Sequence, residues 1–349
     1  MVRARGAARR IGDGEPCFII AEAGVNHNGE LALAKRLVDA AKRAGADAVK
    51  FQTFRTDEIV TRRTKKAKYQ TRSRERTHQS MLRRLELPFE AFEELKAHCD
   101  ARGIEFMSTP YDPESAAFLD GLGVARFKVG SGDLTNRPLI EAVAGTGKQV
   151  ILSTGMATME EVERTVRLVE GKGNRGIVLL HCVTSYPAPA DEVNLSAMWA
   201  LRMAFGYPVG YSDHTVGNEV AIMAVAMGAN VIEKHLTLDR GMVGPDHFAS
   251  AEPDEMADLV RAVRNVELAF GDGIKRLSRA ESANVALVRR SLHARRPLGK
   301  GARLRRGDLK VTRPADGIES WDIGSVVGRR LARRRDTDDP IRPQDLEPR

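Results

Sequence analysis

The stretch Phe18-Ile-Ile-Ala-Glu22, followed at once by Ala-Gly-Val-Asn-His-Asn-Gly29, joins a short apolar run to a polar turn. Seven later stretches of the chain repeat this form. An apolar run of this length, bounded by turn residues, predicts a strand that is buried on both faces, as in a parallel sheet. The predicted strands are Phe18–Glu22, Asp47–Phe51, Ile104–Met107, Ala125–Val129, Gln149–Leu152, Ile177–His181, Pro208–Tyr211 and Val231–His235.

Helix-like segments lie between most of these strands. Several begin at a proline, which suits the first turn of a helix, and are followed by a glycine, which suits its end. The predicted helices are Leu31–Arg43, Pro88–Arg102, Pro113–Leu122, Pro138–Ala144, Met159–Val169, Val216–Met227 and Pro253–Phe270, whereas the 181–207 connection is less clearly helical. The eight strand–helix units end near Asp272 without a change of composition. The predicted fold class is therefore α/β, a (β/α)8 TIM barrel rather than an open doubly wound sheet.

The chain changes character after Gly271. Short β-like pieces are separated there by Gly, Pro and Arg, at Ser291–Ala294, Leu309–Thr312 and Val326–Leu331. They predict a small β-domain that is too small to be catalytic alone. We therefore expect three parts: a catalytic barrel at residues 1–275, a helical linker at 276–289 and the small domain at 290–349.

The composition of the 349-residue chain excludes several classes of protein. The formal net charge is +8, but the arginines gather in separate places, so they predict solvated surfaces rather than one nucleic-acid groove. No apolar run approaches the roughly 18 residues that a membrane helix needs, and no signal-peptide core follows the basic start. The scattered cysteines Cys17, Cys99 and Cys182 fit reduced thiols. We expect a cytoplasmic enzyme that binds neither nucleic acid nor a membrane.

One of the arginine-rich places, residues 61–76, is long for a strand–helix connection. Long connections of this kind are usually functional or mobile. We expect it to be a mobile surface excursion near the mouth of the barrel.

Polar side chains follow every predicted strand. Active sites of these barrels form at the carboxyl ends of the strands, so the polar endings are expected to meet at one mouth. The eight endings are 22–29, 50–52, 108–112, 128–133, 153–156, 181–187, 212–215 and 233–235.

Lys50 and Lys128 each lie inside an otherwise apolar strand, where an unpaired ammonium group is costly. The partner of each lysine is either a carboxylate in a structural ion pair or a bound anion. The nearby hydroxyls of Ser131 and Ser153 favour a bound phosphate or carboxylate. A Schiff base on either lysine is a further possibility.

His214 and His235 end neighbouring strands, which places two imidazoles side by side at the mouth. They either hold a divalent metal ion, whose shell is completed by water and substrate, or are hydrogen-bonded structural histidines. Glu22 and Glu233 are candidates for a proton-transferring carboxyl, and Glu233 is alternatively a group that orients a lysine or histidine.

The other histidines give weaker signals. His181 fits core packing and site lining equally well, and His27 fits a hydrogen-bonded turn better than a third metal ligand. His78, His98 and His293 are expected to be surface or packing residues. The run Gly244-Pro-Asp-His247 either caps the mouth or forms an ordinary turn.

Taken in order, the strand endings resemble the sialic acid synthase family. The resemblance covers nearly the whole chain, because every predicted strand carries one of the motifs. They are 18–29, 49–53, 108–112, 128–133, 151–156, 180–187, 210–215, 233–235 and 244–247. The 290–349 region, with Arg313-Pro314 after a short strand, resembles the family's antifreeze-like SAF domain, a β-clip.

The resemblance implies a transferase that condenses phosphoenolpyruvate with the open-chain aldehyde of an N-acetylated amino sugar of the N-acetylmannosamine type. The products are phosphate and a sialic or related nonulosonic acid. Residues implied as catalytic are Glu22, as the acid–base group, with Lys50 and Lys128. His214 and His235 would hold a divalent metal, most commonly Mn²⁺ with Mg²⁺ or Co²⁺ as alternatives, that polarises the aldehyde. Phosphoenolpyruvate would contact Lys50, Lys128, Ser131, Ser153, Tyr186 and Ser212, and the sugar would contact Gln52, Asp246 and Arg313.

The same resemblance implies a domain-swapped homodimer in which Arg313 reaches the site of the second subunit. One departure is Thr184, where some members have asparagine. The stretch Phe51–Val60, with Lys68-Tyr-Gln70, is closer to the legionaminic acid branch, whose acceptor is a 2,4-diacetamido-trideoxy sugar. N,N'-diacetyllegionaminic and pseudaminic acid synthases are therefore alternatives with the same chemistry. A Schiff-base aldolase and a non-catalytic carbohydrate-binding protein are more distant ones.

Overall fold

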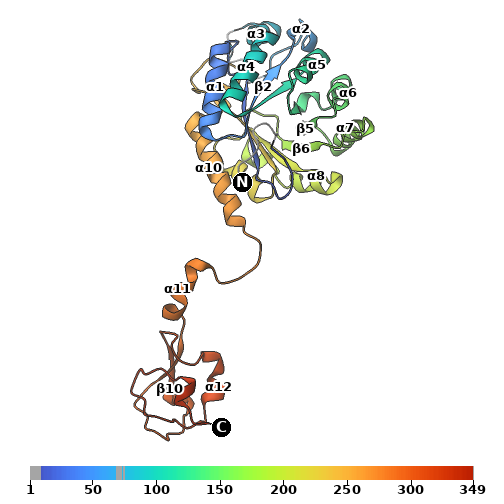
Figure 1. Cartoon of the computed structure of the whole chain (residues 1–349). Helices are drawn as coiled ribbons and strands as arrows, with labels where there is room; N and C mark the ends of the chain where they lie inside the picture. Colours follow the sequence, from blue (N-terminus) through green and yellow to red (C-terminus); the bar gives the residue numbers. More distant parts are fainter. Residues whose placement is uncertain (1–8, 68–72, 74, 349) are drawn as a thin grey trace. The chain divides into compact units, whose positions relative to one another are not determined.

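The computed structural model describes residues 9–67, 73 and 75–348, and it divides into two compact units, Met1–Gly271 and Asp272–Arg349. The first unit is built on eight parallel strands paired in the order β3-β2-β1-β8-β7-β6-β5-β4, and β3 also contacts β4. Figure 1 shows the helices arranged around these strands. The predicted (β/α)8 barrel is confirmed. Its strands are β1 Phe18–Gly24, β2 Ala48–Thr53, β3 Glu105–Pro110, β4 Arg126–Val129, β5 Gln149–Ser153, β6 Ile177–Cys182, β7 Val209–Asp213 and β8 Val231–His235.

The register of the strands decides which side chains meet at the mouth. Glu22 on β1 is the ladder partner of Lys50 on β2 and of His235 on β8. On the next pair, Ser212 of β7 is opposite Glu233 of β8. Parallel strands in this register bring their carboxyl ends to one level, so these polar side chains lie together.

Eight longer helices pack outside the barrel, and each follows a strand. The 181–207 connection, where the pattern was unclear, contains the helix α8. The helices are α1 Leu31–Ala44, α4 Phe89–Arg102, α5 Pro113–Gly121, α6 Arg137–Gly145, α7 Met159–Gly171, α8 Ala197–Phe205, α9 Glu219–Ala226 and α10 Pro253–Phe270. Among the described residues, no helix is long and apolar enough to cross a membrane.

The connection between β2 and α4 contains two further helices, α2 at Thr56–Ile59 and α3 at His78–Leu85. Thr77 begins α3 with a capping box, since its hydroxyl accepts from the Ser80 backbone and the Ser80 hydroxyl accepts from the Thr77 backbone. The predicted excursion at 61–76 falls in this connection, but residues 68–72 and 74 lie outside the described residues.

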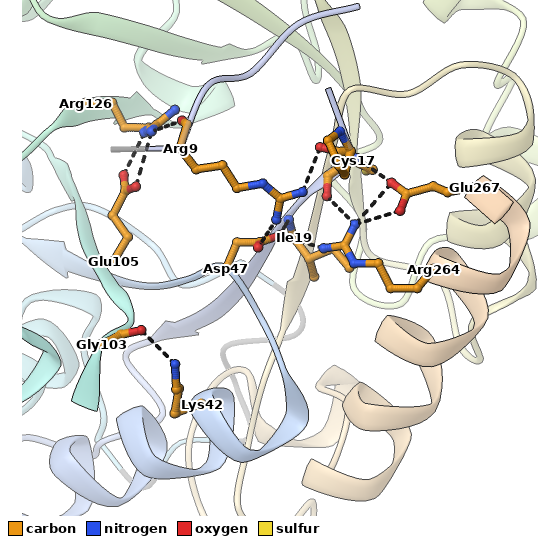
Figure 2. A network of polar contacts seen from close by, with 11 residues as sticks. Arg9, Cys17, Ile19, Lys42, Asp47, Gly103, Glu105, Arg126, Arg264 and Glu267 are labelled. Atoms are coloured by element: carbon orange, nitrogen blue, oxygen red, sulfur yellow. Dashed lines mark hydrogen bonds and ion pairs between the residues drawn. The ribbon is translucent and has the colours of Figure 1, made fainter. Parts of the chain in front are cut away.

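The amino ends of the strands carry an ionic network (Figure 2). Arg264 of α10 donates to the Cys17 carbonyl and to the Asp47 carboxylate, both at 2.8 Å, and Arg9 pairs with the same carboxylate. Arg126, the first residue of β4, pairs with Glu105 at 2.6 Å. The network ties the chain before β1 and the last barrel helix to the strand starts, and so closes this end of the barrel.

The second unit contains the helix α11 at Arg279–Val288 and an antiparallel pair of strands, β9 at Ser291–Ala294 and β10 at Leu309–Thr312. The prediction of a strand at Val326–Leu331 is wrong. Val326 ends the short helix α12 at Ile323–Val326, and Gly328 then adopts a φ of 92°, which interrupts any extended run. Arg330 and Leu331 make only isolated bridges. The division at residues 275 and 289 stays a prediction.

Candidate active site

A cavity of about 490 Å³ opens at the carboxyl ends of the strands. Every strand of the barrel contributes to its wall, through Glu22, Lys50 and Gln52, Thr109, Lys128, Ser153, Cys182, Ser212, and Glu233 with His235. The barrel residues predicted to be catalytic, metal-binding or substrate-binding all line it: Glu22, Lys50, Gln52, Lys128, Ser131, Ser153, Tyr186, Ser212, His214, His235 and Asp246. Arg313 belongs to the second unit, where its Nε donates to the Val288 carbonyl at 2.8 Å.

Two lysines and two glutamates form a buried ionic cluster at the base of the cavity. Lys50 Nζ lies 2.6 Å from Glu22 Oε2 and 3.8 Å from Glu233 Oε2. Lys128 Nζ lies 3.5 Å from Glu233 Oε1, which also accepts from the Ser212 hydroxyl at 3.2 Å. The four charged side chains expose between 2% and 6% of their surface, so their charges compensate one another in a low-dielectric site.

The members of this cluster have unequal proton affinities. Burial raises the pKa of Glu22 to about 7, against the opposing effect of Lys50. For Glu233 burial is outweighed by Lys128 and Lys50, which lower its pKa and keep it ionised. Burial lowers the pKa of Lys128 in spite of Glu233, whereas Glu22 and Glu233 together raise the pKa of Lys50. Glu22 is therefore the carboxyl able to gain and lose a proton near neutral pH. Of the two lysines, Lys128 has the longer contact to a carboxylate, at 3.5 Å against 2.6 Å for Lys50.

A group of hydroxyls lies on the β4–β6 side of the same cavity. Ser131 Oγ accepts from the Gly155 backbone N–H at 3.0 Å. Within the described part of the chain, the buried Ser153 Oγ and Thr184 Oγ1 have no hydrogen-bond partner. Buried hydroxyls without partners are costly, and here they accompany an under-neutralised lysine. This combination fits an anionic ligand with several oxygen acceptors.

His214 and His235 lie beside each other, with ring centroids 5.4 Å apart, and Tyr186 packs against both rings. His214 Nδ1 donates to the Val183 carbonyl at 2.7 Å, which leaves the lone pair of Nε2 free to bind a metal. Burial holds the pKa of His235 well below its usual value, so this imidazole is neutral. No group of three or more metal-binding side chains occurs among the described residues. The pair therefore fits a metal ion only with substrate and water completing the shell.

The structure answers several of the open histidine predictions. His27 belongs to a turn, as predicted, because its Nδ1 accepts from the Gly29 backbone N–H at 3.0 Å. His181 is outside the cavity wall and its Nε2 contacts the Val193 carbonyl at 2.6 Å. His78 was expected to be a surface or packing residue, but it lies at the start of α3 and lines the cavity. Thr77 and Ser80 form a capping box in the structure, but Ser80 is not the Glu or Gln that marks this motif in a sequence, so no clear signal placed a helix there.

The NeuB family model matches residues 37–275, which is most of the chain. The chain belongs to the NeuB family. The SAF domain model matches residues 289–347 in the second unit.

Two curated relatives are N,N'-diacetyllegionaminic acid synthases. The chain is 47% identical to the one from Legionella pneumophila, over 92% of each chain, and 45% identical to the one from Campylobacter jejuni, over 93% of this chain and 98% of the relative. A solved structure, the N-acetylneuraminic acid synthetase from Leptospira borgpetersenii in complex with citrate, superposes with a TM-score of 0.71 and 37% identity. It covers 79% of this chain and 92% of that one.

Proposed function

We propose that this NeuB-family enzyme condenses phosphoenolpyruvate with the open-chain aldehyde of a 2,4-diacetamido-2,4,6-trideoxy hexose, giving a legionaminic-type nonulosonic acid and phosphate. The observation that carries the reaction is that Ser153 and Thr184, whose buried hydroxyls have no hydrogen-bond partner among the described residues, line the same cavity as Lys128. The choice of acceptor rests on the 45–47% identity to the two legionaminic acid synthases. N-acetylmannosamine is the alternative acceptor.

Phosphoenolpyruvate is proposed to bind between the lysines and the hydroxyls. Ser131, Ser153 and Thr184 offer hydroxyl donors on the β4–β6 side, and Lys50 and Lys128 supply positive charge from β2 and β4. Because Lys128 is incompletely neutralised by Glu233 at 3.5 Å, a phosphate or carboxylate oxygen would complete its environment. Ser212 and Tyr186 border the same space from β7 and the β6 loop.

Glu22 is proposed to carry the proton that the reaction moves. Its pKa of about 7 lets it act as acid or base at neutral pH, and Lys50 at 2.6 Å holds its carboxyl in place. Gln52 donates to the other oxygen of Glu22 at 3.4 Å. Gln52 thus connects the acid–base carboxyl to the space where the acceptor sugar binds, and the buried Asp246 faces that space from the loop after β8.

His214 and His235 would hold the divalent metal, and Mn²⁺ is proposed with Mg²⁺ or Co²⁺ as alternatives. When bound there, the metal would polarise the aldehyde oxygen of the acceptor. The hydrogen bond from His214 to Val183 fixes the ring orientation that such binding requires.

Three features remain parts of the same proposal. Arg313 would complete the site of a second subunit in a domain-swapped homodimer, where it would contact the sugar. The free cysteines Cys17, Cys99 and Cys182 are all buried, which suits a cytoplasmic enzyme. The cavity and its cluster of charges suit small substrates rather than nucleic acid or a membrane.

The experiment is an assay of phosphate release from phosphoenolpyruvate by the purified chain. It is run with Mn²⁺ and a panel of acceptors, and the keto acid is detected by mass. We expect release only when both an N-acylated amino sugar and a divalent metal are present, and loss of release when a chelator is added. Release without a sugar, or none with any sugar, would contradict the proposal.

A Schiff-base aldolase is the second candidate, because burial lowers the pKa of Lys128 and so favours a nucleophilic amine. Borohydride treatment in the presence of pyruvate separates the two functions. A covalent adduct on Lys128 together with activity that resists the chelator would support the aldolase. We expect neither.

A further inference from the structure

One side of the cavity is apolar, in contrast to the rest of its surface. We call this side the α2–α3 wall, and it consists of Phe54, Ile59, Val60, Met81, Leu82 and Leu85. Phe54 follows the end of β2 directly, and the other residues belong to α2, its end and α3. The wall lies on the β1–β3 side of the barrel, whereas the hydroxyls of Ser131, Ser153 and Thr184 come from the β4–β6 side.

The wall is a built structure rather than a scatter of exposed side chains. Phe54, Met81 and Leu85 are buried and form a separate hydrophobic cluster with Val25, against which Ile59 and Leu82 pack. The cluster is distinct from the main core of the barrel. Since all six residues line the cavity and three of them are buried, the wall is preorganised for an apolar part of a ligand.

The charges around the wall favour an uncharged ligand group. Among the described residues that line the cavity, Lys50 and Lys128 are the only lysines or arginines, and both already contact carboxylates on the strands. The wall itself is accompanied by the carboxylate of Glu58 and by His78. Burial and the positive charge of Lys66 lower the pKa of His78, and the buried Nδ1 of His78 has no hydrogen-bond partner in the described part of the chain. Lys66 itself donates to the Ser73 hydroxyl and to the Glu75 carbonyl.

We propose that the α2–α3 wall receives the far end of the acceptor sugar and selects a methyl group and an acylamino group over a hydroxymethyl or phosphorylated end. This inference rests on the proposed function and names the residues that set its acceptor class. A methyl group buries its surface against Met81 and Leu82, and the acylamino group pairs with His78. A hydroxyl loses hydrogen bonds to water at such a surface, and a doubly charged phosphate loses more of its hydration there and meets the carboxylate of Glu58.

The magnitudes follow from the chemistry of the two replacements. An apolar pocket discriminates against an added hydroxyl by about 10²-fold in kcat/KM. A doubly charged phosphate that must lose water against an apolar wall beside Glu58 is disfavoured more strongly, and we expect at least about 10³-fold. The expected order of acceptors is therefore the 2,4-diacetamido-2,4,6-trideoxy hexose, then N-acetylmannosamine, then N-acetylmannosamine 6-phosphate.

The test compares kcat/KM for these three sugars in the wild type, in Leu82→Arg and in Leu168→Arg. Leu168 on α7 is a matched control, because it is also a half-buried leucine packed on a barrel helix but does not line the cavity. Leu82→Arg places a cation in the wall, so we expect its preference for the trideoxy sugar over the phosphorylated sugar to fall at least about tenfold relative to wild type. Leu168→Arg is expected to keep the wild-type order.

Ile59→Arg takes the place of Leu82→Arg if circular dichroism shows that the latter does not fold. Equal use of the three sugars by the wild type overturns the inference, as does the same preference in the wall variant and the α7 variant. In both of these cases phosphate release with an amino sugar would still support the proposed function. The absence of release with every sugar overturns the proposed function and the inference together.

Discussion

Replacing Gly155 by alanine tests the proposed site for phosphoenolpyruvate most directly. A Cβ atom at this position would lie 2.3 Å from Thr184 Oγ1 and 2.8 Å from Ser131 Oγ, whereas ordinary contacts begin at 3.4 Å. The Thr184 hydroxyl, or the loop that carries it, must therefore retreat by about 1 Å. A displacement of this size in a group that positions substrate can lower the rate about 10²-fold.

We expect Gly155→Ala to lower kcat/KM for phosphoenolpyruvate by about 10²-fold, mainly through a higher KM, as measured by phosphate release at saturating acceptor. Gly132→Ala is the matched control. Gly132 lines the same cavity next to Ser131, but an added Cβ would meet nothing within 4 Å. The reasoning is refuted if Gly155→Ala folds and stays within about threefold of wild type, or if both alanine variants lose activity equally.

Three further predictions concern stability and are measured by chemical denaturation of the full chain. Burial lowers the pKa of His27 to about 4 from 6.5, so the unfolded chain takes up a proton below pH 6.5 that the folded chain refuses until about pH 4. Lowering the pH from ~7.5 to ~5 should thus reduce the free energy of unfolding by about 2 kcal/mol more in wild type than in His27→Asn. Equal reductions in the two proteins would contradict this. Lys234→Met removes the cation that lies 2.6 Å from the buried Asp213 carboxylate, so it should lower the free energy of unfolding by about 3–5 kcal/mol. We expect the added Asp213→Asn change to restore part of that loss, and a cost below about 1 kcal/mol would show that the pair is dispensable. Gly210→Ala would place a Cβ 2.4 Å from a backbone carbonyl of β8, so it should lower the free energy of unfolding by about 2–3 kcal/mol. Gly121→Ala is the control, because an added Cβ there would meet nothing within 4 Å and should leave the stability unchanged. Equal effects of the two changes would refute the steric argument.

The barrel was predictable because its strands are short apolar runs with polar endings. Strand β8 has the predicted bounds, Val231–His235, and β1 extends the predicted strand by two residues. A parallel barrel gathers its strand ends at one mouth, so the placement of Lys50 and His214 in one cavity followed from topology alone.

Other parts of the molecule depend on contacts that a single sequence does not display. Helix α3 buries only Met81 and Leu85 of its eight residues, so its apolar signal is too short to stand out beside the arginines around it. The position of His78 in the cavity depends on that helix and was missed with it. The unequal pKa values of Glu22 and Glu233 arise from distances to Lys50 and Lys128, which strand order does not determine.

The ionic network of Arg264, Asp47 and Arg126 lies at the strand starts, and none of these three residues lines the cavity. The contacts that hold the strand starts together are therefore separate from the residues of the α2–α3 wall that line the cavity. A library of variants confined to the α2–α3 wall would leave the ionic network at the strand starts unchanged, and it could be screened for new acceptors. Directed evolution of this enzyme toward unnatural amino sugars should therefore begin at the half-buried Ile59, Val60 and Leu82, because Phe54, Met81 and Leu85 are buried in the cluster that holds the wall together.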